Sequence, residues 1–292
     1  MELNEYIKQK RPTLADSSVV TYTSILRSLY GRVFKSKDID VSKYDDTTAI
    51  LSALKDITPN KRKTILSALV IITDNPKYRE QMMDDIKQYN KDIATQEKSP
   101  SQEANWITMN EVKTVFDALT KQANLLYKKA NPSVKDLQDI QSYIIVALLG
   151  GMYVAPRRSL DYCNFKIKEV DPTMNYLDKK TLVFNSYKTA RVYGKQTVDV
   201  PPPLLKILKK WVSINKTDFL LFDNAGKKLT PVKLNQRLNK IFNGRKISVN
   251  ALRHGYLTDK YGDMIQKNKE IDETMTDMGS SKSMLNTYLK KE

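Results

Sequence analysis

Three segments of the chain carry side chains that together could cleave a phosphodiester without a metal ion. The first holds Arg157 and Arg158 directly after an apolar run, the second holds Lys188, and the third holds Arg253. Tyr288 follows near the C-terminal end. Such a cleavage requires a side-chain nucleophile, cations on the non-bridging phosphate oxygens and an acid that protonates the leaving oxygen. These residues supply all three kinds of group.

Each of these residue types suits one role. An arginine guanidinium stays charged and binds a phosphate through two parallel hydrogen bonds. A lysine that is crowded by other cations has a lowered pKa and becomes a workable acid. A tyrosine forms a phosphate ester that conserves the bond energy for a later reversal. Asp161 lies three residues after Arg158 on the same expected helical face, so we expect it to hold that guanidinium in place.

Other chemistries do not fit the composition. The chain has one cysteine, Cys163, and one histidine, His254, which are too few for a structural zinc site or a disulfide. It also lacks a GxxxxGK[ST] phosphate loop. We therefore expect neither a metal ion nor a cofactor. The acidic pairs at residues 45–46 and 84–85 are interpreted as helix caps and solvated surface, because negative charge is favourable at helix N-termini.

The charge balance points to a polyanionic partner. The 292 residues include 49 Lys and Arg against 33 Asp and Glu, which gives a net charge of +16. Such an excess favours nucleic acid first and an anionic membrane surface second, and a merely basic protein is the third alternative. The sequence starts without a secretory signal, and its longest apolar run, residues 143–154, is too short for a bilayer. We expect an intracellular protein that binds nucleic acid and no membrane.

Hydrophobic periodicity predicts a helical domain over residues 1–93, followed by a linker. Apolar residues at helical spacing indicate helices over residues 20–34, 45–54, 59–72 and 77–93. The basic faces of these helices suit a DNA backbone, and Lys61, Arg62 and Lys63 are candidate phosphate contacts. Residues 94–106 lose the periodicity and are rich in Ser, Pro, Gln and Glu, which predicts a linker.

Residues 107–292 form a second domain of mixed structure. Thr108 and Glu111 match a capping box, and residues 137–153 read as an apolar core helix. Strands are expected over residues 165–170, 181–187 and 196–200, and the last two form a hairpin that carries Lys188 and Arg191. Helices are expected over residues 204–212, 231–242, 249–261, 267–277 and 282–290. The expected fold class is mainly α with a small antiparallel β-sheet, an α+β fold.

Taken in order, the reactive segments resemble the tyrosine recombinase (phage-integrase-like) family. That family has an arginine in a G-x-R-x-x-[ED] context, a lysine on a β-hairpin, an [HK]-x-x-R-H motif, a G-[HW] position and a C-terminal tyrosine. The corresponding residues here are Arg158 with Asp161, then Lys188, then Arg253 with His254, then Met278-Gly279, and finally Tyr288. The resemblance covers residues 107–292, and residues 1–93 are similar to the family's helical core-binding domain.

The chain departs from the family pattern at three places. Asn250 stands at the [HK] position, and Ser280 follows Gly279 where the family has His or Trp. The Pro-Arg-Arg sequence leaves Arg157 as an alternative to Arg158. Asparagine and serine form hydrogen bonds but do not take up a proton near neutral pH. Slow chemistry, or dependence on another residue, is therefore expected.

The resemblance implies a site-specific DNA recombinase or integrase that is carried by a virus or mobile element. It would act as a homo-tetramer on double-stranded DNA, in the cytoplasm or nucleus of a host. It implies that Tyr288 attacks the scissile phosphorus and forms a 3′-phosphotyrosyl bond. Arg158 and Arg253 would bear the charge on the equatorial oxygens, while Lys188 protonates the 5′-oxygen. The assisting hydrogen bonds are assigned to Asn250, His254 and Ser280, with His254 as a residue that orients the site.

Two alternatives share most of these residues. A type IB topoisomerase uses nearly the same groups but relaxes supercoiled DNA as a monomer. A decayed recombinase would bind DNA without cutting it, and the two missing family histidines motivate that interpretation.

Overall fold

The computed structural model describes residues 2–290 and divides the chain into two compact units, Met1–Lys98 and Ser99–Glu292. These are the N-terminal unit and the C-terminal unit. The boundary falls inside residues 94–106, the segment predicted as a linker. Within residues 2–290, no helix combines the length and the apolar character that a membrane crossing requires.

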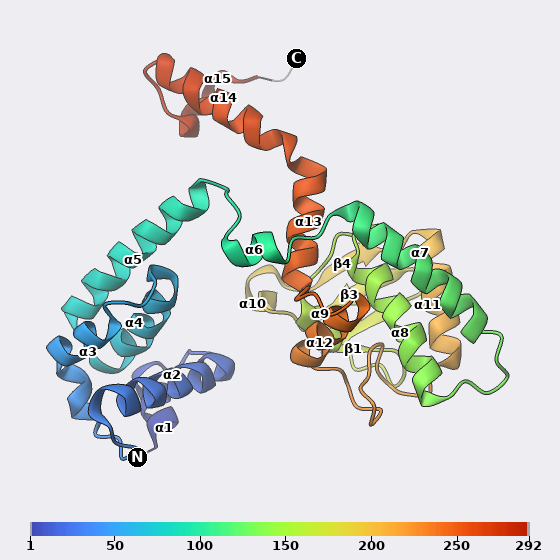
Figure 1. Ribbon diagram of the computed structural model, residues 1–292, viewed down its shortest axis with the longest axis horizontal. Coiled ribbons are helices and arrows are strands. Elements are labelled where there is room, and N and C mark those ends of the chain that lie inside the picture. The colour runs from blue at the N-terminus through green and yellow to red at the C-terminus, as the bar shows by residue number, and fades with distance from the viewer. Residues whose placement is uncertain (1, 291–292) are drawn as a thin grey trace. The chain divides into compact units, whose positions relative to one another are not determined.

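The N-terminal unit is built from helices, as the apolar spacing predicts (Figure 1). They are α1 (Leu3–Lys10), α2 (Asp16–Phe34), the 3-10 helix η1 (Val41–Asp45), α3 (Thr47–Leu54), α4 (Pro59–Thr73) and α5 (Pro76–Ala94). Neither α1 nor η1 was predicted from the apolar spacing. The Asp46 side chain accepts the Ala49 amide at the start of α3, so this part of the first acidic pair is a helix cap. Proline opens α4 and α5, where its missing amide hydrogen costs nothing.

Two buried tyrosines join the helices of the N-terminal unit. Tyr44 donates a hydrogen bond to the Leu26 carbonyl at 2.9 Å, and Tyr78 donates to the Tyr44 carbonyl at 2.7 Å. Both side chains lie in the apolar core of this unit. Burial raises the pKa of both phenols, so both remain protonated donors at neutral pH.

A buried ion pair joins α4 to α5 and corrects two predictions. Asp85 is 2% exposed, and the Arg62 guanidinium contacts its two carboxylate oxygens at 2.6 and 2.9 Å. Arg62 is therefore engaged inside the unit rather than available as a DNA phosphate contact, and Asp85 is not solvated. A carboxylate removed from water needs a cation beside it, and only the packing of α5 on α4 brings these two residues together.

Substituting Asp85 by alanine is expected to destabilise the N-terminal unit by about 3 kcal/mol, because a largely buried guanidinium loses its counter-charge. Hydrogen exchange of the α4 and α5 amides measures this loss. Asp84→Ala is the matched control, since Asp84 is exposed and pairs with Lys87 only at 3.5 Å. We expect the control to change stability by less than about 0.5 kcal/mol. Equal effects of the two substitutions would contradict a stabilising role for the buried pair.

The C-terminal unit combines helices with one small sheet (Figure 1). Its helices are α6 (Pro100–Ala104), α7 (Met109–Leu126), α8 (Val134–Leu149), α9 (Ser159–Cys163), α10 (Ala190–Tyr193), α11 (Pro202–Ile214), α12 (Pro231–Ile241), α13 (Val249–Tyr261), α14 (Asp263–Asp277), the 3-10 helix η2 (Lys282–Met284) and α15 (Leu285–Tyr288). Its strands are β1 (Phe165–Lys166), β2 (Asn175–Asp178), β3 (Thr181–Phe184) and β4 (Gln196–Asp199). The mainly helical α+β fold class is confirmed.

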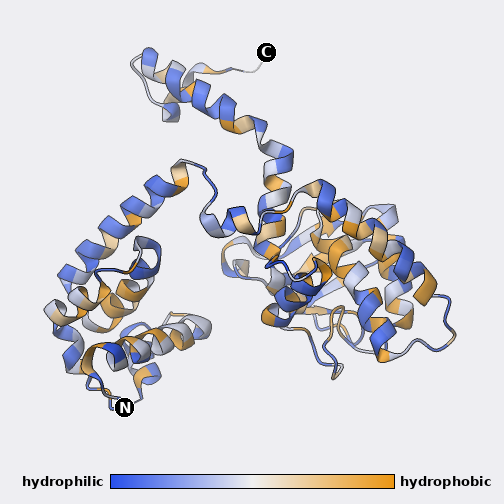
Figure 2. Ribbon diagram, viewed as in Figure 1, coloured by the Kyte–Doolittle hydropathy of each residue, from blue (hydrophilic) through white to orange (hydrophobic). Residues whose placement is uncertain are grey.

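The core of this unit is organised around α8. Residues 140–149 of that helix are all buried, and Figure 2 shows its largely apolar composition. The capping box at Thr108 and Glu111 is present at the start of α7, which packs on α8. The helix predicted over residues 137–153 is therefore a core helix, but it spans Val134–Leu149 and ends before the two glycines at 150–151.

The sheet has the order β1-β2-β3-β4 and is mixed rather than antiparallel throughout. β1 and β2 pair in parallel, whereas β2–β3 and β3–β4 are antiparallel. The predicted hairpin is β3 with β4, in which Phe184 pairs with Gln196. The sequence analysis missed β2, because its residues 175–178 lack a clear alternation of apolar and polar side chains.

The segment predicted as a linker is partly helical. α6 lies within residues 94–106 and begins with a capping box formed by Ser99 and Gln102. Just after it, the Asn105 side chain accepts the Lys246 amide at 3.1 Å, and the Trp106 carbonyl accepts a hydrogen bond from Arg245. These contacts hold residues 99–106 on the C-terminal unit. The helix α6 was not predicted because the segment has few apolar residues and is held by polar contacts instead.

Candidate active site

A cavity of about 230 Å³ opens at the start of α9. Its lining comprises Ala155, Pro156, Arg157, Arg158, Asp161, Tyr187, Thr189, Tyr193, Gln196 and Arg253. These residues come from the three segments that the sequence analysis singled out: the start of α9, the connection between β3 and β4, and α13. We call this the arginine cavity, since three guanidiniums meet in it. Such a concentration of positive charge suits an anion.

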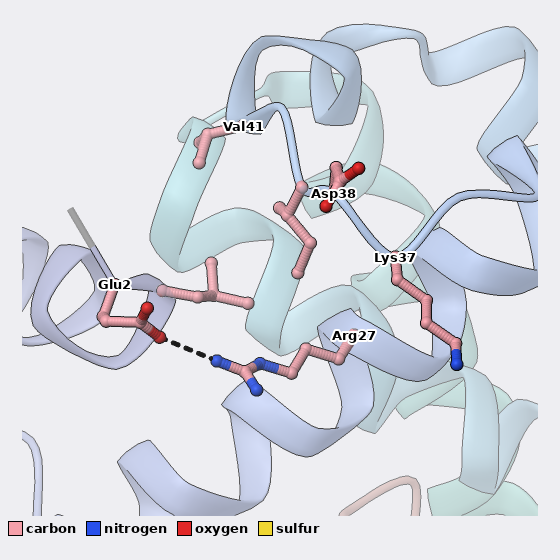
Figure 3. Close-up of a pocket in the computed structure, with 7 residues that line it drawn as sticks. Glu2, Arg27, Lys37, Asp38 and Val41 are labelled. Carbon is pink, nitrogen blue, oxygen red and sulfur yellow. Dashed lines mark hydrogen bonds and ion pairs between the residues drawn. The ribbon is translucent and has the colours of Figure 1, made fainter.

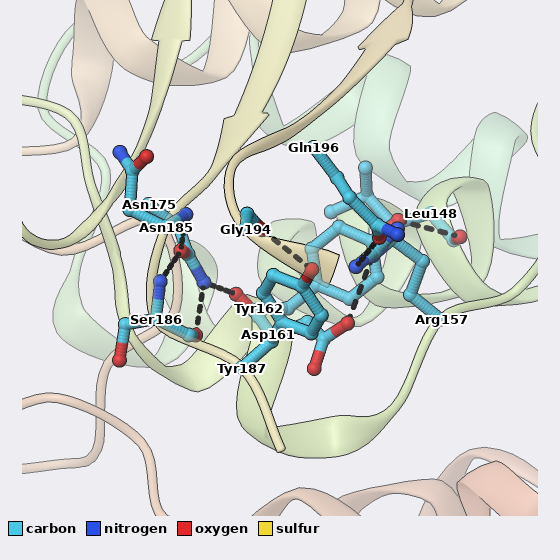
Figure 4. A network of polar contacts seen from close by, with 10 residues as sticks. All are labelled: Leu148, Arg157, Asp161, Tyr162, Asn175, Asn185, Ser186, Tyr187, Gly194 and Gln196. Carbon is cyan, nitrogen blue, oxygen red and sulfur yellow. Dashed lines mark hydrogen bonds and ion pairs between the residues drawn. The ribbon is translucent and has the colours of Figure 1, made fainter. Parts of the chain in front are cut away.

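Arg157 is fixed inside the arginine cavity (Figure 4). Its Nε donates to Asp161 Oδ2 at 2.8 Å, and its Nη2 donates to Gln196 Oε1 at 2.9 Å. The guanidinium also lies 4.0 Å from the centre of the Phe184 ring. The prediction that Asp161 holds Arg158 is therefore wrong, because Asp161 holds Arg157. Arg158 precedes α9 with an extended backbone, so the helical spacing rule does not apply to its side chain.

Asp161 is a buried carboxylate surrounded by cations. It is 2% exposed, and its Oδ1 atom makes no hydrogen bond with any residue that the structure describes. Burial raises the pKa of this carboxyl, while Arg157, Arg158 and Arg253 act in the opposite direction. Asp161 thus fixes Arg157, and the remaining two guanidiniums of the cavity are left without a carboxylate of their own.

Arg158 and Arg253 are the cations of the cavity that are free to meet a ligand. The Arg158 side chain is exposed and forms no hydrogen bond or ion pair with residues 2–290. Arg253 is half-buried on α13, and its hydrogen bond to Asn250 is long, at 3.4 Å. A half-buried guanidinium with one weak partner is suited to binding an oxyanion.

The hairpin connection brings further groups to the rim of the cavity. Tyr187 and Thr189 line it, and Lys188 lies between them in the chain with an exposed side chain. Arg191 is also exposed, on α10. The predicted hairpin turn is instead a longer connection that contains α10. Lys188 is therefore adjacent to the arginine cavity, although it is not one of its lining residues.

Asn175 holds the two sides of the site together and was missed by the sequence analysis (Figure 4). Its Nδ2 donates to the carbonyls of Asp161 at 2.6 Å and Ser186 at 2.9 Å. Its Oδ1 accepts the amides of Asn185 and Ser186, both at 2.8 Å. The side chain is fully buried. Its only signal in the sequence was a polar residue next to the aromatic Tyr176, which did not distinguish it from a loop residue.

Substituting Asn175 by alanine is expected to lower the free energy of unfolding of the C-terminal unit by about 3 kcal/mol, because buried carbonyls and amides lose their partner. Tryptophan fluorescence during urea unfolding reports on this unit, since Trp106 and Trp211 both lie in it. Asn110→Ala, at an exposed position of α7, is the control and should behave like the parent. An unchanged urea midpoint for Asn175→Ala would show that the site does not depend on this residue.

Asn250 and His254 line a different cavity, of about 220 Å³. It also includes Trp106 of the segment after α6 and Lys246 and Ser248 before α13. The structure therefore places His254 away from the arginine cavity, where it has an exposed side chain. Asn250 connects the two cavities through its hydrogen bond to Arg253.

Tyr288 and Ser280 lie outside the lining of the arginine cavity. Tyr288 ends α15 with 56% of its surface exposed, and Ser280 lies in the turn after α14. Lys282 pairs with Asp272 at 3.2 Å, so η2 is tied back to α14. The structure thus brings together Arg157, Arg158, Asp161 and Arg253, but not the C-terminal tyrosine.

The predicted basic contacts of the N-terminal unit differ in availability. Lys61 is exposed, whereas Lys63 lies 2.9 Å from the centre of the Tyr89 ring. A separate cavity of about 460 Å³ in this unit is lined by Arg27 and Lys37, among others, and Arg27 binds Glu2 at 2.9 Å (Figure 3). Lys61 and Lys37 are therefore better placed for a phosphate than Arg62.

No group of three or more His, Cys, Asp or Glu side chains within residues 2–290 is arranged to hold a metal ion. Cys163 is buried, and burial raises the pKa of its thiol to about 12. No protein-family model matches the chain, and no curated protein matches it to a significant degree. The chemical interpretation of the site therefore depends on the arginine cavity and on the sequence motifs that meet there.

Proposed function

We propose that this protein is a DNA strand transferase of the tyrosine recombinase type, which breaks and rejoins DNA through a 3′-phosphotyrosyl intermediate. The observation that carries the proposal is the convergence of Arg158 and Arg253 on one cavity from positions far apart in the chain. A cavity with two available guanidiniums matches the non-bridging oxygens of a phosphodiester. The net charge of +16 supports a polyanionic substrate.

The chemical step is an in-line displacement at phosphorus. The Tyr288 phenol oxygen forms the new bond to phosphorus, and the bond from phosphorus to the 5′-oxygen breaks. Lys188 gives a proton to the departing oxygen, while the phenol proton passes to solvent. Arg158 and Arg253 stabilise the charge on the equatorial oxygens. Rejoining is the reverse reaction, in which a 5′-hydroxyl attacks the phosphotyrosyl bond and releases Tyr288.

In this proposal Arg157 positions the site and Arg158 contacts the phosphate. Arg157 already has a carboxylate, an amide oxygen and an aromatic ring as partners, so a phosphate would have to displace them. Arg158 has no such partner among the described residues. The Arg157–Asp161 pair fixes the start of α9. The backbone at this start then sets the direction of the Arg158 side chain.

The position of Tyr288 sets a further requirement on the reaction. Its side chain is exposed on the terminal segment and must enter an arginine cavity, either of its own chain or of another copy. Several copies assembled on DNA, with a tetramer as the proposed form, would allow the tyrosine of one copy to enter the arginine cavity of another.

A nicked suicide duplex tests the proposal. Cleavage near the nick releases a short fragment, so religation fails and the covalent complex accumulates. We expect a protein–DNA adduct that survives denaturation, with DNA attached to Tyr288 by peptide mapping. Supercoiled plasmid without a special site is the companion substrate, because efficient relaxation would favour a type IB topoisomerase. The absence of any adduct, together with salt-sensitive DNA binding, would instead favour a binding protein that has lost catalysis.

That second candidate, a DNA-binding protein without catalysis, is favoured by two observations. Tyr288 is not in the cavity, and neither Asn250 nor Ser280 can act as the proton acceptor that a histidine would supply. The suicide duplex separates the two candidates directly.

A further inference from the structure

The connection between β3 and β4 exposes two large apolar side chains at consecutive positions. Val192 is 76% exposed and Tyr193 is 65% exposed, and both lie on α10. Exposure of apolar surface to water is unfavourable, and burial of these side chains against a partner would lower the free energy. Tyr288 and Leu289, at 56% and 68%, are another such pair in this unit, whereas Val232 at 66% stands singly in the chain.

The connection is held in a defined shape. The Tyr187 hydroxyl donates to the Gly194 carbonyl at 2.6 Å, which ties the two ends of α10 together. Inside the loop, the Gly194 amide donates to the Ala190 carbonyl at 2.8 Å. Gly194 has a φ of +63°, a conformation that glycine adopts without strain. Val192 and Tyr193 are therefore presented by a closed loop rather than by a loose one.

Cations flank the two apolar residues in the chain. Lys188, Arg191 and Lys195 all belong to this connection, and all three are exposed. Tyr193 itself lines the arginine cavity, next to Arg157, Arg158 and Arg253. An apolar pair bordered by cations complements a nucleic acid, in which apolar base faces lie between two lines of phosphates.

We propose that Val192 and Tyr193 form a wedge that inserts between stacked base pairs beside the phosphate bound in the arginine cavity. The proposal rests on the proposed function, because it takes duplex DNA as the ligand of that cavity. Insertion of apolar side chains at a base step unstacks it and kinks the duplex, and contact with the base faces offsets the cost. Lys188, Arg191 and Lys195 then neutralise the flanking phosphates, and the Tyr193 ring stacks on an exposed base.

Unstacking at this place would help the reaction. A kink beside the scissile phosphate opens the backbone there, which gives the terminal tyrosine access along the line of attack. The wedge would also favour sites that contain easily unstacked steps, since the deformation costs less in such sequences. It would therefore act as a specificity-determining element that reads deformability rather than base edges.

Competition between two duplexes tests the wedge without knowledge of the target sequence. One duplex is short and fully paired, and the other is identical except for a central pair of mismatched bases, where the step is already loosened. We expect the parent protein to prefer the mismatched duplex by about tenfold, because insertion there avoids most of the unstacking cost. The double variant Val192→Ser with Tyr193→Ser should lose this preference and bind the two duplexes with equal affinity.

Two further variants serve as controls. Tyr193→Phe keeps the aromatic ring and should keep the preference, whereas Val232→Ser removes an exposed valine on α12 and should behave like the parent. Equal binding of the two duplexes by the parent, or an unchanged preference in the double serine variant, would overturn the wedge while DNA binding stands. Failure of the parent to bind either duplex would overturn the proposed function, and the wedge with it.

Discussion

Substituting Tyr288 by phenylalanine is expected to abolish the covalent protein–DNA adduct while DNA affinity stays within about twofold of the parent. The variant lacks only the phenol oxygen that forms the new bond to phosphorus. The side chain is exposed, so its loss should not disturb the fold. Denaturing gel electrophoresis of a nicked suicide duplex measures the adduct, and a binding titration at the same salt concentration measures affinity.

Two other tyrosines are needed to test this prediction, one as a control and one as an alternative site of attachment. Tyr261→Phe changes an exposed phenol on α13 and should form adduct at the parental rate. Tyr193 lines the arginine cavity, so peptide mapping must show that the DNA is attached to Tyr288 and not to Tyr193. Adduct formation by Tyr288→Phe at the parental rate would refute Tyr288 as the nucleophile.

Mixing a variant that lacks the nucleophile with a slow cavity variant shows which copy supplies the tyrosine. Tyr288→Phe keeps a complete arginine cavity, whereas Arg158→Ala keeps the nucleophile. A mixture regains adduct only when the tyrosine of one copy enters the cavity of another. Activity that stays absent in the mixture, with both variants bound to DNA, indicates that each chain uses its own tyrosine.

Substituting Arg158 or Arg253 by alanine is expected to slow adduct formation by about 10²–10³-fold each, roughly 3–4 kcal/mol of transition-state stabilisation. Each substitution removes a preorganised cation from the charge that develops on the phosphate oxygens. Arg158 is exposed and without a partner among the described residues, so Arg158→Ala should leave the free energy of unfolding within about 0.5 kcal/mol of the parent. Single-turnover kinetics on the suicide duplex, with urea unfolding in parallel, separates catalysis from stability.

Arg157→Ala is the matched comparison and should behave differently. It leaves the carboxylate of Asp161, which is 2% exposed, without its ion-pair partner. We expect the C-terminal unit to lose about 3 kcal/mol of stability, because an unpaired buried charge is costly. A stable Arg157→Ala protein that fails to cleave, together with a fully active Arg158→Ala protein, would reverse the roles assigned to the two arginines.

Local rules were sufficient for most helices. The start of α7 at Thr108 and Glu111 follows from a capping box, and the core helix α8 follows from its strongly apolar second half. Such signals depend on neighbours within one or two turns, so a single sequence contains them. The same reasoning missed α6 and β2, where the segments are short and polar contacts to other parts of the unit replace periodic burial.

The candidate site was only partly predictable. Arg158, Arg253 and the neighbourhood of Lys188 do meet at one cavity, as the order of motifs indicates. The partner of Asp161 was assigned by helical spacing, which failed because Arg158 stands before the first helical residue. The role of Asn175 could not be predicted, because its side chain joins α9 to the hairpin connection and belongs to no local sequence pattern.

By itself, the sequence determined the order of the reactive groups, the positive charge and the helices that carry them, because composition, periodicity and caps are properties of short stretches of chain. Only the tertiary structure decided which arginines already have a carboxylate partner. Arg62 pairs with Asp85 and Arg157 pairs with Asp161, whereas Arg158 and Arg253 form an ion pair with neither carboxylate. It also placed Tyr288 on an exposed terminal helix outside the arginine cavity. Ion pairing and burial depend on contacts between segments distant in the chain, and a buried carboxylate takes whichever cation the packing brings within reach.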